Sequence, residues 1–111
     1  MDNLILDTDS YKASHFLQYP PGTEGMYSYI ESRGGLYPYT LFFGLQYILK
    51  TALTQRVTMA MVEEAAAFFP PHHEPFPYDG WRYIAERGGA LPLRIRAVPE
   101  GSVVPTHNVL M

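Results

Sequence analysis

The sequence predicts an α+β fold, in which a small sheet has helices packed against it. Apolar residues recur every three or four positions in some segments and alternate with polar residues in others. Prolines and glycine pairs separate these segments. At 111 residues, the chain is long enough for one small domain, which we place at residues 1–111, or for a truncated segment of a larger protein.

Two longer helices follow from the periodicity of the apolar residues. The clearest pattern begins after Thr40, which we expect to be an N-cap, and repeats as far as Leu53. A second helix is expected from Thr58, again as an N-cap, to about Phe69, because the proline pair 70–71 cannot continue it.

Two shorter helices follow from their flanking residues. The first begins near Tyr11, where the side-chain oxygens of residues 7–10 can cap it, and it ends by Tyr19 before two prolines. The other begins at Asp79 as a cap and ends at the glycine pair 88–89.

Strands are predicted where apolar and polar residues alternate. Met26–Glu31 and residues 91–97 both have this period of two. The last segment, 103–111, is apolar and strand-like and lacks a cap or a polar tail, so we expect the chain to be cut short.

Composition excludes several classes of protein. The net charge of −3 gives no general attraction for nucleic acid or for an anionic membrane. Without cysteine, the chain has neither disulfides nor thiolate metal sites. No apolar run approaches the roughly 18 residues of a membrane span. The acidic N-terminus is not a secretory or transit peptide, and we therefore expect a cytoplasmic protein.

Few residues are candidates for chemistry on their own. His72 and His73 are adjacent in a proline-rich loop, where a solvated loop is a better interpretation than a metal site. Asp7 and Asp9 are better explained as helix caps than as an acid–base pair. Arg33 follows a predicted strand beside two glycines, where its guanidinium can reach an anion.

Five sequence blocks nevertheless resemble the start of the nicotinamide phosphoribosyltransferases, and they occur in the same order. The blocks are Asp7-Thr8-Asp9-Ser10-Tyr11-Lys12 with His15; Gln18-Tyr19-Pro20-Pro21-Gly22-Thr23; Tyr27-Ser28-Tyr29 with Glu31 and Arg33; Phe43-Gly44-Leu45-Gln46-Tyr47-Ile48-Leu49; and Val98-Pro99-Glu100-Gly101 through Asn108-Val109-Leu110. The resemblance covers nearly the whole chain but only about the first quarter of a family enzyme. It implies the N-terminal part of a type II phosphoribosyltransferase, from which the catalytic barrel is absent.

The resemblance also implies a function. The family are glycosyltransferases of NAD salvage, which join nicotinamide to phosphoribosyl pyrophosphate at sites formed across a homodimer. In this segment, Tyr11 matches the tyrosine that stacks on nicotinamide, Asp9 the acid beside it, and Arg33 an arginine that meets the phosphoribosyl substrate. No catalytic or metal-binding residue is implied here; Mg²⁺ and ATP are implied only for the full-length enzyme. We therefore expect this segment to be inactive alone.

Alternatives remain at this stage. Nicotinate phosphoribosyltransferases share part of the first block, so the segment could belong to one of them. A freestanding domain that self-associates or binds a separate catalytic portion is a further possibility. His107 departs from the family pattern, since a smaller residue, often glycine, is usual there.

Overall fold

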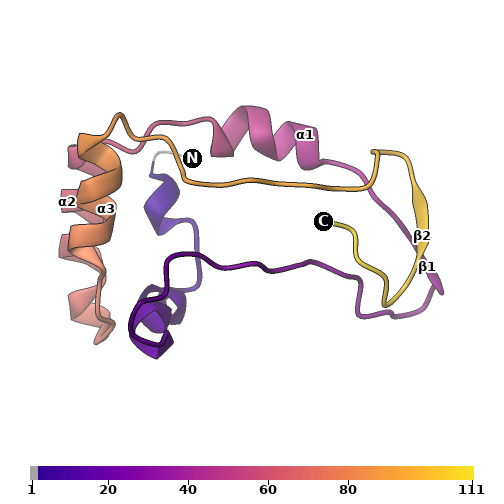
Figure 1. Cartoon of the computed structure of the whole chain (residues 1–111), viewed down its shortest axis with the longest axis horizontal. Helices are drawn as coiled ribbons and strands as arrows, with labels where there is room; N and C mark the ends of the chain where they lie inside the picture. Colours follow the sequence, from indigo (N-terminus) through magenta and orange to yellow (C-terminus); the bar gives the residue numbers. More distant parts are fainter. Residues whose placement is uncertain (1–2) are drawn as a thin grey trace. The chain divides into compact units, whose positions relative to one another are not determined.

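The computed structural model describes residues 3–111, which form two compact units (Figure 1). Unit 1 contains the described residues up to Thr23 together with Thr51–Pro92, and unit 2 contains Glu24–Lys50 and Leu93–Met111. In chain order the elements are the 3-10 helices η1 (Leu4–Leu6) and η2 (Ser10–Gln18), strand β1 (Tyr39–Leu41), helix α1 (Leu45–Ile48), the π-helical turn η3 (Leu49–Leu53), helix α2 (Met59–Phe68), the 3-10 turn η4 (Pro70–His72), helix α3 (Tyr78–Glu86) and strand β2 (Val103–Pro105).

Helix α2 confirms the expected second helix. The Thr58 hydroxyl accepts a hydrogen bond from the Met61 amide at 3.3 Å, which satisfies one of the free amides of the first turn. The α-helix ends at Phe68, and Pro70 begins a tighter 3-10 turn. The N-cap and the prolines therefore fix this helix at both ends.

The two shorter helices differ in detail from the expectation. Helix α3 begins at Tyr78, so Asp79 lies inside its first turn and is not the cap. Its carboxylate still lies favourably at the positive end of the helix dipole. Residues 10–18 form a 3-10 helix, η2, and the Asp9 side chain makes no capping hydrogen bond to it.

The core of the described chain lies in unit 1. Five buried side chains form it, with partly buried residues of η2 and α3 packed around them: Ile5, Val57, Val62, Ala65 and Phe69. The Phe76 ring stacks on the Phe69 ring with centroids 5.4 Å apart. The buried Asn3 amide donates to the Met61 carbonyl and to Glu64, so η1 is tied to α2 by satisfied polar groups.

A close backbone contact joins the end of α3 to the segment before α2. Gly89 has a φ of +72°, and its carbonyl accepts a hydrogen bond from the Val57 amide at 2.9 Å. A Cβ on Gly89 would stand 2.2 Å from the Val57 carbonyl oxygen, whereas one on the adjacent Gly88, with φ +90°, would meet open space. Position 89 therefore requires glycine for space as well as for conformation.

Gly89→Ala should lower the free energy of unfolding by about 3 kcal/mol or more, because a methyl group would collide with backbone that cannot move aside. Gly88→Ala is the matched control and should cost only about 1 kcal/mol, the penalty of the left-handed conformation alone. Urea unfolding followed by circular dichroism measures both. Equal losses in the two variants would contradict the contact.

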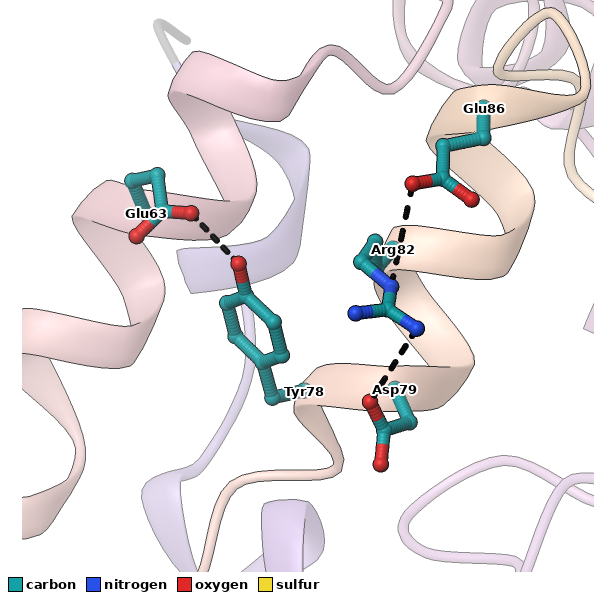
Figure 2. Close-up of polar contacts among 5 residues, drawn as sticks. All are labelled: Glu63, Tyr78, Asp79, Arg82 and Glu86. Carbon is teal, nitrogen blue, oxygen red and sulfur yellow. Dashed lines mark hydrogen bonds and ion pairs between the residues drawn. The ribbon is translucent and has the colours of Figure 1, made fainter.

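Helices α2 and α3 are also joined by polar side chains, as Figure 2 shows. The Tyr78 hydroxyl donates to the Glu63 carboxylate at 2.5 Å. This hydrogen bond, more than any other cause, raises the pKa of Tyr78 above its ordinary value. Arg82 lies 3.7 Å from both Asp79 and Glu86 along α3, and such exposed ion pairs add little stability.

The raised pKa of Tyr78 predicts a pH-dependent stability. A raised pKa in the folded state means that this contribution is complete below about pH 10 and is lost as the pH rises through the folded pKa. Tyr78→Phe should therefore unfold at lower urea than the parent near neutral pH, and the difference should shrink above about pH 10. Tyr83→Phe, which removes the hydroxyl group of another tyrosine of α3, is the control for the substitution itself. A constant difference at all pH values would contradict the assignment.

Unit 2 is built on an antiparallel pair of short strands. β1 pairs with β2 in the register Tyr39↔Pro105, Thr40↔Val104 and Leu41↔Val103. Hydrogen bonds between Phe42 and residues 101–102 continue the ladder at one end, and a bond from the Thr106 amide to the Pro38 carbonyl continues it at the other. The prediction of a strand in the last segment is confirmed for residues 103–105.

Other strand predictions in this unit need correction. Met26–Glu31 is not a strand, and its pairing is limited to its end. There Glu31 forms an antiparallel bridge with Val109, and Ile30 makes main-chain hydrogen bonds with residues 110 and 111. Residues 91–97 are likewise in no strand. Alternation identified segments that run extended in Figure 1, but pairing also requires a neighbouring strand.

The helix predicted from Thr40 to Leu53 begins later. Thr40 lies in β1, and α1 starts at Leu45 and continues as the π-helical η3. The Glu100 carboxylate accepts hydrogen bonds from the amides of Gly44, at 3.1 Å, and Gln46, at 2.7 Å. A distant acidic side chain thus satisfies the start of α1, in place of the expected threonine cap.

Strand pairing and helices together confirm the α+β class. Among the helices of residues 3–111, none is long and apolar enough to cross a membrane.

Candidate functional site

The first candidate cluster lies at the start of η2, where Asp9, Tyr11 and Lys12 come together. The Lys12 ammonium group lies 3.1 Å from the Asp9 carboxylate and 5.9 Å from the centre of the Tyr11 ring. Hydrogen bonding to Asp9 is the main cause that raises the pKa of Lys12, and the charge of Asp9 adds to it. Asp9 therefore holds a protonated lysine beside the tyrosine.

Tyr11 is available for contact with a ligand. Its side chain is 54% exposed, and its ring touches the His15 ring edge-on, with centroids 5.5 Å apart. Among residues 3–111, nothing accepts or donates a hydrogen bond at its hydroxyl group. Apart from the local contacts with Lys12 and His15, the aromatic surface is thus free to stack against a flat ring.

A groove of about 390 Å³ lies beside this cluster in unit 1. Thr8, Lys12 and His15 contribute to its wall, and the rest is mainly apolar and aromatic, formed by Leu4, Ile5, Ala13, Phe16, Tyr19, Phe69, Phe76, Pro77, Trp81 and Leu91. Tyr11 is not part of the wall. Asp9 and Tyr11 therefore lie outside the groove, whereas Lys12 belongs to the cluster and also to the wall of the groove.

Arg33 lies in unit 2, two residues after the bridge between Glu31 and Val109. The Ser32 carbonyl accepts a hydrogen bond from the His107 amide at 2.9 Å, and the Ser32 hydroxyl accepts one from the Gly34 amide at 3.3 Å. The backbone on both sides of Arg33 is therefore fixed. Its guanidinium is exposed and, within residues 3–111, has no acidic partner.

His107 packs beside this turn and has a φ of +64°, in the left-handed region that L-residues other than glycine seldom adopt. An added Cβ at Gly34 would lie 3.5 Å from the His107 ring, so the ring occupies the space next to the turn.

The comparisons with known proteins agree with one another. The family model for the nicotinamide phosphoribosyltransferase N-terminal domain matches residues 3–95. This chain belongs to that family. A nicotinamide phosphoribosyltransferase from Xanthomonas campestris pv. campestris (strain 8004) is 63% identical over 112 residues, which cover all of this chain and 24% of the relative.

Within the nicotinamide phosphoribosyltransferase family, the chain corresponds to the N-terminal domain. It spans about a quarter of the length of this curated relative and is an N-terminal segment of such a protein. Asp9, Tyr11 and Arg33 all fall inside the matched range. Asp9 and Tyr11 lie together at the start of η2, whereas Arg33 belongs to the other unit.

Two further residues have roles that the motifs do not indicate by themselves. Lys12 lies in the first motif, and its i,i+3 spacing from Asp9 is the sequence signal for their ion pair. Glu100 caps a helix more than 50 residues away, and no local pattern predicts this contact.

Proposed function

We propose that this segment contributes substrate-binding residues to a nicotinamide phosphoribosyltransferase, which forms nicotinamide mononucleotide and pyrophosphate from nicotinamide and phosphoribosyl pyrophosphate in NAD salvage. The observation that carries the proposal is the exposed Tyr11 ring beside the Asp9–Lys12 pair, inside a chain of this family. In this proposal Tyr11 stacks on the pyridine ring of nicotinamide. Asp9 lies beside the ring and fixes Lys12.

Arg33 supplies the second contact in this proposal. Its guanidinium is exposed on a fixed turn, and a planar fork of donors suits the phosphate of a phosphoribosyl group. Since no acidic side chain within the described residues neutralises it, the charge is free to pair with an anion.

The segment acts across a homodimer in the cytoplasm, according to the same proposal. Many large apolar side chains of unit 2 are exposed, including Tyr27 at 94% and Leu36 at 88%. Isolated proteins seldom expose so much apolar surface, so a further part of the enzyme or a second subunit covers it. The phosphoribosyl substrate is highly charged and does not cross membranes freely, which supports a cytoplasmic location.

Magnesium and ATP stay a prediction for the full-length enzyme, as the resemblance implies, and the proposal gives this segment no cofactor. Among residues 3–111, no three acidic or histidine side chains gather into a group suited to a metal ion.

A fusion enzyme tests the proposed function. This chain replaces the matched quarter of the Xanthomonas relative, and the fusion is assayed for nicotinamide mononucleotide. We expect the fusion to be active and the 111-residue chain alone to be inactive, because two substrate contacts cannot stabilise the charged transition state of ribosyl transfer. A folded but inactive fusion, or product formed by the chain alone, would overturn the proposal.

Substitutions of Tyr11 in the fusion test the stacking role. Tyr11→Phe should leave the KM for nicotinamide nearly unchanged, because the aromatic face survives and the hydroxyl has no partner in the described chain. Tyr11→Ala should raise this KM about tenfold, since stacking contributes roughly 0.5–1.5 kcal/mol beyond burial. Tyr83→Ala, a change at another exposed tyrosine, is the control. Equal and negligible effects of both Tyr11 variants would refute stacking.

The Arg33 role has a separate test. Arg33→Lys keeps the charge but removes the bidentate fork, so the KM for phosphoribosyl pyrophosphate should rise by about tenfold while that for nicotinamide changes little. Arg87→Lys, next to the other glycine pair, serves as the control. If both substrates were affected equally, Arg33 would have a structural role instead.

A further inference from the structure

The last residues of unit 2 lie between two other segments of the same unit. The Ile30 amide donates to the Met111 carbonyl at 2.8 Å, and the Leu110 amide donates to the Ile30 carbonyl at 2.8 Å. On the other side, the Val98 amide donates to the Leu110 carbonyl at 2.9 Å. The main chain of Leu110 is thus hydrogen-bonded to a different segment on each side, and its side chain is buried.

Main-chain pairing stops beyond this point on both flanking segments. Within the described chain, residues 24–29 and 93–97 make no main-chain hydrogen bonds. Figure 1 shows both segments continuing as extended chain in the direction in which the C-terminus points. Two segments that pair with opposite sides of one strand lie about 9.5 Å apart, which is twice the spacing between neighbouring strands.

The direction of the missing strand follows from the bridge between Glu31 and Val109. This bridge is antiparallel, so the chain beyond Met111 would pass residues 29 to 24 in descending order. Met111 already pairs with Ile30 through its carbonyl group. A continuing strand would therefore begin in place and would need no turn.

The side chains beside the open edges suit a strand with apolar residues. Tyr27, Tyr29, Leu93 and Ile95 are exposed large apolar side chains on these two segments. Open edges of this kind bind extended chain, with main-chain hydrogen bonds supplying affinity and side chains supplying selectivity.

We propose that residues 24–29 and 93–97 form a slot for one extended strand, antiparallel to the first segment, and that its occupant is the stretch directly following Met111 in a longer chain. The relative in which this chain spans 24% of the length has such a continuation, since about three quarters of it lies outside the match. The slot depends on backbone geometry and is independent of the proposed enzymatic activity.

The amides of an extended segment point alternately to its two sides, so the slot can be tested at individual residues. Ile30 and Val98 direct their amides at the C-terminal segment. In extended chain every second amide points the same way, so those of Met26, Ser28, Arg94 and Arg96 face the slot. The amides of Tyr27, Tyr29 and Ile95 face away from it.

The experiment compares the 111-residue chain with one extended by about eight residues, taken from the sequence that follows the matched part of the Xanthomonas relative. Hydrogen exchange of single amides is measured by NMR. In the extended chain, the four slot-facing amides should exchange at least about tenfold more slowly, whereas those of Tyr27, Tyr29 and Ile95 should not change. The same extension with proline at every second position should remove the protection.

Three results would overturn the slot or its occupant. The first is equal protection of slot-facing and outward-facing amides in the extended chain. The second is that the extension slows none of the slot-facing amides although the Ile30 and Leu110 amides stay protected. The third is protection of the unextended chain that rises with protein concentration, which would make a second copy the occupant. If the extended chain does not fold, the same amides are measured in the fusion enzyme, with the same expected and contradicting patterns.

Discussion

Unit 2 depends on main-chain hydrogen bonds rather than on a core. Among its described residues, Leu110 is the one buried side chain, while most of its large apolar side chains are exposed. The ladder from residue 38 to 42, its partners at 101–106 and the pairing of Ile30 with the C-terminal residues hold the unit in shape. Backbone pairing supplies direction and register, but it buries little apolar surface. The unit therefore has the geometry of a sheet and lacks the burial that makes a sheet independently stable.

Unit 1 has the opposite character. Its buried cluster around Val62 and Phe69, the satisfied Asn3 and the contact of Gly89 with Val57 are all internal. Tyr11 thus belongs to a unit with its own core. Its ring contacts Lys12 and His15 of the same short helix, and Lys12 pairs with Asp9 at the N-cap. The local geometry of this cluster requires nothing from unit 2.

The sequence predicted what local chemistry determines. Thr58 and Pro70 fixed α2 because a cap and a helix breaker act on their immediate neighbours. The alternation in 26–31 and 91–97 did not predict pairing, because a strand partner is set by distant parts of the chain. The start of α1 was misplaced for the same reason, since its carboxylate cap comes from Glu100. At the candidate site, motifs in the sequence identify Asp9 and Tyr11. They do not predict that the Asp9 carboxylate pairs with Lys12 instead of capping η2, because the two alternatives differ only in local geometry.

Arg33, the residue of the proposed phosphate contact, lies on backbone that is held by hydrogen bonds to the C-terminal segment. Its turn is held by Ser32, whose carbonyl group is bound by the His107 amide, and residues 107–111 then continue into the pairing with Ile30. Any strand or subunit that holds this last segment would therefore also hold the backbone that carries Arg33, the residue of the proposed phosphate contact. Tyr11 does not have this dependence, because its cluster is local. If both proposed contacts exist, assembly of the longer chain would act more strongly on the one at Arg33 than on the one at Tyr11, since only Arg33 is carried by backbone that continues into the open edges of unit 2.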